Sequence, residues 1–308
     1  MPPLASQTDL VAAFKAERIA GEPFPVRQVS TAFQLTDRKF YMVDNSGSGS
    51  DPILEYLVTH EKHVMEAFAF ALDGEWCKAK MSSGLEGFAI CTSPSGDDSP
   101  HCAQYIRKEA IASGIADRVQ VANAFAGDRA VDAFDTVQRR TGCWGTFPYL
   151  TSAQLQGLAS TYTGKPEYKD AVPVPMLTLD ELVLGPAGGP QRDVVIAAMK
   201  VDVEGSEGAM LAGAARLLQQ GRIYNLIMEL NHNAWRLGKI DPFTEVLPKL
   251  VGLGKAGFRC RLSNYGGWQV QGNFDMSKTR LSELLKEGWV GLDMWCSLAE
   301  ERRHVPGA

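Results

Sequence analysis

The chain has 308 residues, of which 45% are hydrophobic and 22% are charged, and its formal net charge is -5. This balance is typical of a packed globular protein and excludes an intrinsically disordered chain. The acidic net charge argues against a general nucleic-acid-binding protein, because such proteins need an excess of Lys and Arg to displace counterions from phosphates. We therefore expect no nucleic-acid partner.

The cysteines and the lengths of the apolar runs indicate the cellular compartment in which the protein works. The six cysteines are scattered and contain no CxxC pair, and a chain of this size does not need disulfides, so we expect free thiols in a reducing compartment. No stretch approaches the roughly 18 consecutive apolar residues of a membrane-spanning helix, and the N-terminus has no signal-peptide run. The expected protein is soluble and cytoplasmic, with no membrane partner. The sequence does not determine its oligomeric state.

In chain order, the first half of the chain contains short predicted elements. Each is identified by the spacing of its apolar residues and by the turn residues that bound it. The expected elements are a helix at 8–20, a strand at 40–43, helical spacing over 51–72, a strand at 87–92, a helix at 99–113 and a strand at 118–124.

Residues 128–170 are the least regular segment, with aromatic residues among Gly, Thr and Pro. A long irregular stretch is usually a functional lid or a surface insertion, and both interpretations remain open. We predict an N-terminal extension with a helix and a strand at 1–60. A main domain at 61–300 follows, with the irregular insertion inside it.

The second half alternates apolar strands with helices. The expected elements are a strand at 172–177, a short helix at 179–184, a strand at 194–201, a helix at 206–220, a strand at 223–230, a helix at 242–256 and strand segments at 258–262, 268–271 and 289–298. Because buried strands that alternate with helices form βαβ units, this order predicts an α/β protein with a mainly parallel, doubly wound sheet.

Acidic residues follow two of these buried strands. Asp202 and Glu204 end the first strand and precede Gly205, which lets the chain turn directly into a helix. Glu229 and Asn231 end the next strand. Since ligands of open α/β sheets bind beyond the carboxyl ends of the strands, the three carboxylates predict a functional site at that edge.

Structural explanations exist for each acid taken alone. Asp202 could cap the following helix, and Glu229 could satisfy loop amides. Other functional motifs are weaker still. His60 and His63 stand at i, i+3 and not at the i, i+4 spacing of a helical zinc site, so no metal site is predicted. A nicotinamide dehydrogenase is disfavoured because no G-x-G-x-x-G follows a first strand.

Three segments carry a resemblance to a known family: VPVPMLTLDEL (172–182), MKVDVEGSEGAMLAGAARLL (199–218) and LIMELN (226–231). They resemble the FkbM-type S-adenosylmethionine-dependent methyltransferases. The resemblance implies a Rossmann-like, three-layer fold with a mostly parallel seven-stranded sheet. It implies S-adenosylmethionine as cofactor and O-methylation of a small-molecule or glycan hydroxyl.

The resemblance also implies roles for individual residues. Asp202 would orient or deprotonate the acceptor, with Glu204 and Glu229 in supporting positions. Upstream, the segments around 87–95 and 118–128 look like the family's second and third strands. Ser93, Asn123 and Ala124 would then contact the cofactor. Ser93 stands where relatives have an acid that holds the ribose hydroxyls.

The glycine motif of the family's first strand has two candidates. Asp73-Gly74 lies at the right distance before the second strand but has one glycine, whereas Gly47 and Gly49 match locally and lie too far upstream. We favour Asp73 and Gly74 as the cofactor loop. Because either motif departs from the family pattern, a catalytically inactive protein that keeps the methyltransferase fold as a binding or structural subunit is the alternative.

Overall fold

A computed structural model describes part of the chain. The described residues are 26–29, 40–43, 87–92, 124–139, 168–189, 192–264, 267–268, 273–288 and 292–304. The predicted helices at 8–20, 51–72 and 99–113 lie outside them, as does the predicted strand at 118–124 except for its last residue. The predicted strand at 40–43 is confirmed as β2 (Phe40–Val43), which pairs antiparallel with β1 (Val26–Val29).

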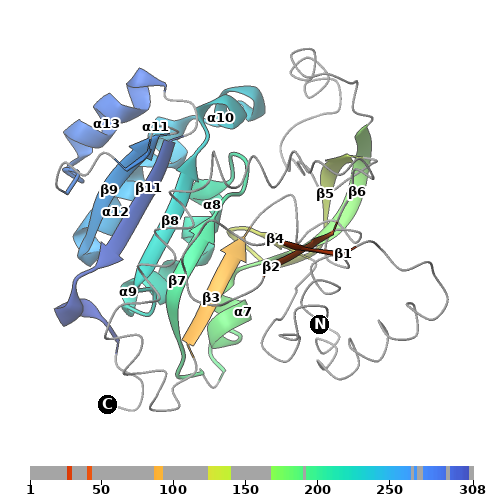
Figure 1. The fold of residues 1–308 in the computed structure, drawn as a ribbon, viewed down its shortest axis with the longest axis horizontal. Coiled ribbons are helices and arrows are strands. Elements are labelled where there is room, and N and C mark those ends of the chain that lie inside the picture. The colour runs from red at the N-terminus through yellow and green to blue at the C-terminus, as the bar shows by residue number, and fades with distance from the viewer. Residues whose placement is uncertain are drawn as a thin grey trace.

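The largest sheet has six strands in the order β10-β9-β11-β8-β7-β3 (Figure 1). They are β3 (Gly87–Thr92), β7 (Val195–Val201), β8 (Asn225–Leu230), β9 (Phe258–Asn264), β10 (Gly267–Trp268) and β11 (Leu292–Leu298). The pairs β3–β7 and β7–β8 are parallel, whereas β11 is antiparallel to both β8 and β9. The sheet is therefore mixed.

The α/β class is confirmed, but the described strands do not form the single, mostly parallel seven-stranded sheet that we predicted. The antiparallel half consists of β11, β9 and β10, where β10 folds back on β9 through a short connection. The sequence of β9 carries a signal of this arrangement. Phe258, Cys260 and Leu262 alternate with two arginines, a pattern typical of a strand with one solvated face and hence of antiparallel pairing.

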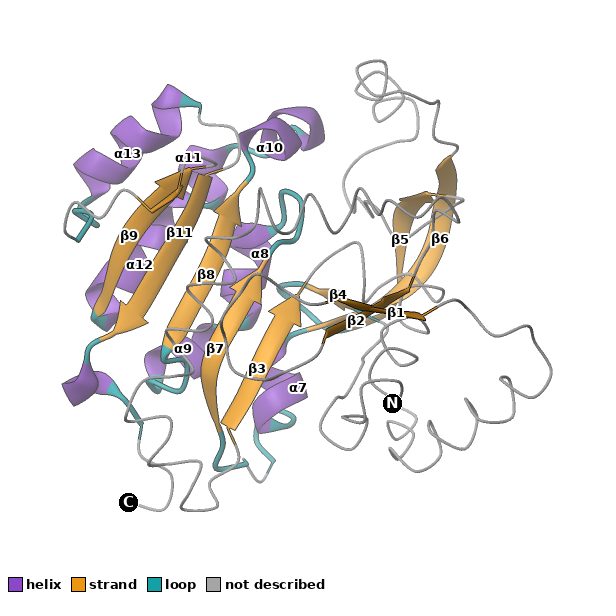
Figure 2. Ribbon diagram, viewed as in Figure 1, coloured by secondary structure: helices purple, strands orange, loops and turns teal. Residues whose placement is uncertain are grey.

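Helices cover one face of this sheet, behind it in the view of Figures 1 and 2. The helices of this layer are α7 (Leu179–Leu184), α8 (Glu207–Gly213), α9 (Ala215–Gln219) and α12 (Leu247–Ala256), and α13 (Lys278–Glu287) contacts α12. The core lies between the layers, where Ile196 and Met228 of the sheet pack with Leu217 and Leu250 of the helices. No helix in the described residues is long and apolar enough to span a bilayer.

The helix predicted at 206–220 is interrupted at Ala214, which is buried between α8 and α9. The carboxylate of Asp180 accepts hydrogen bonds from the backbone N–H groups of Arg216 (2.8 Å) and Leu217 (2.9 Å), in the first turn of α9. A carboxylate at this point accepts hydrogen bonds from amides that have no partner within the helix, and it is attracted to the positive end of the helix dipole. Asp180 therefore stabilises a second helix start that the apolar spacing did not reveal.

A second, three-stranded sheet has the order β4-β6-β5, with β4 (Phe125–Ala126), β5 (Val131–Arg139) and β6 (Tyr168–Leu177). The prediction of irregular structure is wrong for the nine residues of β5, which pair antiparallel with β6. Tertiary pairing decides here, because a partner strand far along the chain supplies the hydrogen bonds. Phe125, Val174 and Met176 form a small core for this sheet.

The prediction of free thiols is wrong for Cys260 and Cys296, which form a disulfide. The two residues lie directly opposite each other on the antiparallel strands β9 and β11, with their Cα atoms 4.0 Å apart. Both side chains are fully buried. A separation of 36 residues gave no spacing signal, because only the strand register brings the sulfurs together.

Candidate functional site

The turn between β7 and α8 begins at Asp202 and contains two residues with positive φ. Glu204 has φ of 46° and Gly205 has φ of 102°. A Cβ atom at Gly205 would lie 3.0 Å from the Cβ of Ala234 in α10 (His232–Gly238). Glycine is therefore favoured here both by the positive φ and by the close approach of α10. Glu204 is not a glycine, so its positive φ is a strained conformation. Non-glycine residues with positive φ concentrate at functional sites.

The buried carboxylate of Glu207 holds this turn. One oxygen accepts the backbone N–H of Gly205 at 2.9 Å, and the other accepts the indole N–H of Trp235 at 2.6 Å. Both Glu207 and Trp235 are almost completely inaccessible to solvent. The side chain therefore fixes the turn against α10. We had not predicted Glu207 as a site residue, because its partner Trp235 lies 28 residues away.

Asn231 joins the end of β8 to the same turn. Its side-chain amide donates to Glu204 Oε2 at 2.7 Å, and its carbonyl oxygen accepts the backbone N–H of Ala234 at 3.0 Å. The second bond caps α10. Asn231 thus connects the carboxyl ends of two parallel strands.

Asp202 lies at the centre of the acidic group. The ammonium of Lys200 is 3.0 Å from Asp202 Oδ2, and Glu229 hydrogen-bonds to the Asp202 side chain. Asp293 lies opposite Glu229 on β11 and adds to the negative charge around it. Because Ser206 occupies the position before α8, the alternative in which Asp202 caps that helix is wrong. We call Asp202, Glu204 and Glu229, together with Lys200 and Asn231, the acidic rim.

Burial changes the proton affinity of the rim. Burial raises the pKa of Glu204 to about 8, and the nearby charges of Asp202 and Glu207 add to the effect. Burial likewise raises the pKa of Glu229 well above its ordinary value, assisted by Asp202 and Glu204. Burial raises the pKa of Glu207 to about 7, although its hydrogen bonds from Gly205 and Trp235 oppose the shift. Near neutral pH, Glu204 therefore retains its proton.

Asp202 Oδ1 is buried and accepts no hydrogen bond from an N–H or hydroxyl group of the described residues. A buried acceptor without a donor is costly. The other oxygen, Oδ2, is 3.0 Å from the Lys200 ammonium.

The exit of β3 lies beside this group. Thr92, the last residue of β3, is in register with Val201, the last residue of β7. Of the predicted cofactor-binding residues, Asp73, Gly74, Ser93 and Asn123 lie outside the described residues, as do the alternative Gly47 and Gly49. Ala124 directly precedes β4, which contacts α8. The predicted roles of all these residues remain predictions.

The raised pKa values predict a pH-dependent stability. Between pH 4.5 and about 8, the carboxyl of Glu204 is protonated in the folded chain and ionised in the unfolded chain, so unfolding releases a proton. The free energy of unfolding therefore falls as pH rises through this window, by at most about 1.4 kcal/mol per pH unit for one group. Glu204→Gln should remove about 1 kcal/mol per unit of this slope.

Urea denaturation at pH 5, 6, 7 and 8 measures that slope. Glu283→Gln is the matched control, because Glu283 is exposed on α13, where it pairs with Arg280. The control should retain the slope of the unmodified chain. An unchanged slope in Glu204→Gln would show that Glu204 does not hold a proton in the folded state.

Within the described residues, no group of three or more His, Cys, Asp and Glu side chains is arranged to hold a metal ion. The rim carboxylates instead bond to one ammonium, one amide and each other.

The fold and the rim define a class of protein. An α/β sheet whose parallel strands end in carboxylates is typical of proteins that bind a small ligand at the carboxyl edge. A family model described as the Methyltransferase FkbM domain matches residues 100–260, more than half of the chain. The chain therefore belongs to the FkbM methyltransferase family. Neither a curated protein nor a solved structure matches the chain.

Proposed function

We propose that this protein is an S-adenosylmethionine-dependent methyltransferase that methylates a hydroxyl oxygen of a small molecule or glycan. One observation carries the proposal: the FkbM match at 100–260 contains the strands β7 and β8, whose carboxyl ends form the acidic rim. The acidic net charge and the absence of a basic stripe make a nucleic-acid acceptor a poor alternative.

The oxygen atoms of the rim fit the hydrogen-bond donors of the cofactor. S-adenosylmethionine supplies a methyl group activated on a positively charged sulfonium, and it carries an ammonium group and ribose hydroxyls. Asp202, Glu204 and Glu229 offer oxygen atoms to such donors, and Lys200 is the one cationic side chain in the rim. A donor of such a ligand would satisfy Asp202 Oδ1, which is buried and has no hydrogen-bond partner among the described residues.

We propose Asp202 as the base or orienting group in this mechanism. The ion pair with Lys200 holds its carboxylate in one position, and Glu229 hydrogen-bonds to it from the neighbouring strand. Asp202 would accept the proton of the acceptor hydroxyl, which makes the oxygen a better nucleophile. Glu207 would be a positioning residue. Its carboxylate accepts the backbone N–H of Gly205 and so holds the turn that carries Asp202 and Glu204. Positioning of the two substrates supplies most of the remaining rate.

Cofactor binding is the direct test. S-adenosylhomocysteine should give heat in a calorimetric titration and should raise the thermal unfolding midpoint of the full chain. At about 100 times the dissociation constant, a ligand that binds the folded chain alone adds about 2.7 kcal/mol to the free energy of unfolding. NAD⁺ at the same concentration is the control and should have no effect. Absence of heat and of a midpoint shift at millimolar S-adenosylhomocysteine would reject the proposal.

The structural-subunit alternative has one observation in its favour. The rim carboxylates have internal partners, since Lys200 pairs with Asp202, Asn231 with Glu204 and Trp235 with Glu207. Such a network would stabilise the end of the sheet without any ligand. Methyl transfer that depends on Asp202 would exclude this alternative.

A further inference from the structure

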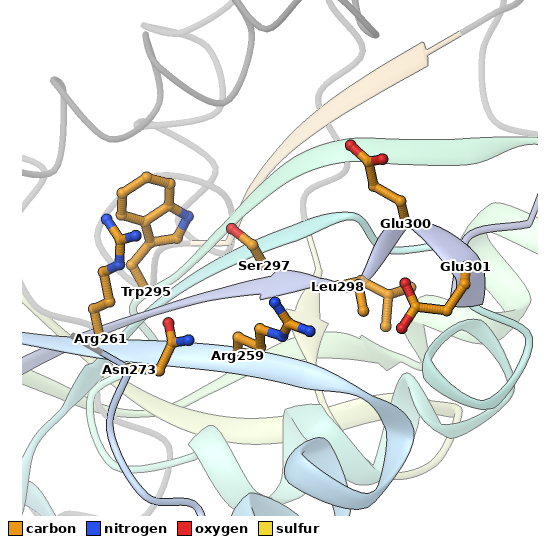
Figure 3. Close-up of a pocket in the computed structure, with 9 residues that line it drawn as sticks. Arg259, Arg261, Asn273, Trp295, Ser297, Leu298, Glu300 and Glu301 are labelled. Carbon is orange, nitrogen blue, oxygen red and sulfur yellow. The ribbon is translucent and has the colours of Figure 1, made fainter.

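A pocket of about 440 Å³ lies between β9, β11 and the short 3-10 helix Glu300–Arg302 (Figure 3). It lies on the sheet face away from the helical layer. Phe258, Cys260 and Cys296 belong to the core beneath the helices, so the residues that alternate with them face the other side. The lining residues are Arg259, Arg261, Asn273, Trp295, Ser297, Leu298, Ala299, Glu300 and Glu301.

This pocket is separate from the acidic rim. Ser297 is in register with Asn225, at the amino end of β8, whereas the rim follows the carboxyl ends of β7 and β8. The lining residue Trp295 comes nearer to the rim, because it is in register with Ile227, two residues and about 7 Å before Glu229. A ligand in the pocket would therefore lie beside the site that we propose for methyl transfer and not in it.

One side of the pocket is cationic. Arg259 and Arg261 are two residues apart on β9, which places their Cα atoms about 6.6 Å apart on the same face. The guanidinium of Arg261 lies over the ring of Trp295, 5.6 Å from its centroid, and this contact fixes the position of the charge. In the part of the chain that the structure describes, neither guanidinium has a carboxylate partner.

The other side of the pocket is anionic. Glu300 and Glu301 begin the 3-10 helix, and both are exposed. Neither forms an ion pair with any described residue. Figure 3 shows the two glutamates at one end of the pocket, Arg261 and Trp295 at the other end, and Arg259 between them. The pocket is therefore neutral as a whole but has separated charges.

We propose that this pocket binds a small zwitterion of the size of a short peptide, with its carboxylate toward Arg259 and Arg261 and its ammonium toward Glu300 and Glu301. A simple anion would leave the two glutamates uncompensated, and a simple cation would leave the two arginines uncompensated. An extended tripeptide spans about 10 Å and fits within 440 Å³. The amide of Asn273 lines the pocket and could bond to the polar backbone of such a ligand, whereas the hydroxyl of Ser297 donates to Asn225 Oδ1 at 2.8 Å and could only accept a hydrogen bond.

The test compares peptides that differ in their terminal charges. Trialanine, N-acetyl-trialanine and trialanine amide are titrated into the full chain, and binding is followed by calorimetry. Trialanine should bind most tightly, and removal of either terminal charge should weaken binding about tenfold. Equal affinities for the three peptides, or no binding of trialanine at millimolar concentration, would overturn the proposal.

Single variants assign the two ends. Arg261→Gln should reduce the preference for trialanine over trialanine amide, because only Arg259 then remains for the carboxylate. Glu301→Gln should reduce the preference for trialanine over N-acetyl-trialanine, because only Glu300 then remains for the ammonium. Arg236→Gln is the matched control, because Arg236 is exposed on α10 and does not line the pocket. An equal loss in the control would show that net charge alone attracts the peptide. Binding of S-adenosylhomocysteine, measured in parallel, should not change in any of these variants, and this separates the proposal from the proposed function.

Discussion

Asp202→Asn should lower the rate of methyl transfer by about 10²- to 10⁴-fold, the range typical of a lost general base. Asparagine has nearly the same shape as aspartate but cannot accept a proton from a hydroxyl group. It also loses the charge that pairs with Lys200 at 3.0 Å. If Asp202 acts on the acceptor in the transition state, kcat should fall more than KM rises. Transfer of a labelled methyl group from S-adenosylmethionine to a panel of hydroxylated small molecules and oligosaccharides measures both constants.

Two controls accompany this prediction. Glu283→Gln removes an exposed carboxylate on α13, so its kcat should equal that of the unmodified chain. Circular dichroism and thermal unfolding of Asp202→Asn establish that the variant is folded. A folded Asp202→Asn variant with full activity would show that Asp202 is not the base, and the family assignment would stand without this mechanism.

Gly213→Ala should destabilise the protein by about 1–3 kcal/mol, the usual cost of overpacking a filled site. Gly213 is the last residue of α8, and a Cβ atom there would lie 1.9 Å from the carbonyl oxygen of Gly127. Backbone occupies that space, so no side-chain rotation can relieve the clash. The substitution would separate α8 from the end of β4, where the two sheets meet the helical layer.

The matched control for this prediction has the opposite sign. Gly252 lies inside α12, and a Cβ atom there would meet nothing within 4 Å. Gly252→Ala should therefore stabilise the protein by up to about 1 kcal/mol, because alanine has the higher helix propensity. Chemical denaturation of both variants at one pH measures the two changes. If both variants were stabilised, the close contact between Gly213 and Gly127 would be wrong.

The pattern of residues close together in the chain was sufficient to predict several helices and strands. The apolar run before Asp202 predicted β7, and the helix predicted at 179–184 is α7 with Thr178 as its cap. These predictions depend only on residues that are neighbours in the chain, where side-chain periodicity and capping act directly. The family was also recognisable from contiguous motifs, and the match at 100–260 confirms it.

The rim was predicted in part. The placement of Asp202, Glu204 and Glu229 after neighbouring parallel strands implied that they meet. In the structure the two strand ends are joined by the hydrogen bond from Asn231 to Glu204. Their roles stay predictions. The partners Lys200 and Glu207 were missed, because each is identified by a contact across a turn or with another helix and not by its spacing.

The amino-acid sequence by itself determined the α/β class, the family and the positions of the acids at strand ends, because these follow from local periodicity and from motifs of adjacent residues. The tertiary structure alone decided the antiparallel half of the sheet, the disulfide between Cys260 and Cys296, and the charge-separated pocket beside Trp295. Each of these depends on the register between strands that are far apart in the chain. Register is set by the packing of whole faces against each other, so it is a property of the assembled sheet and not of any one segment.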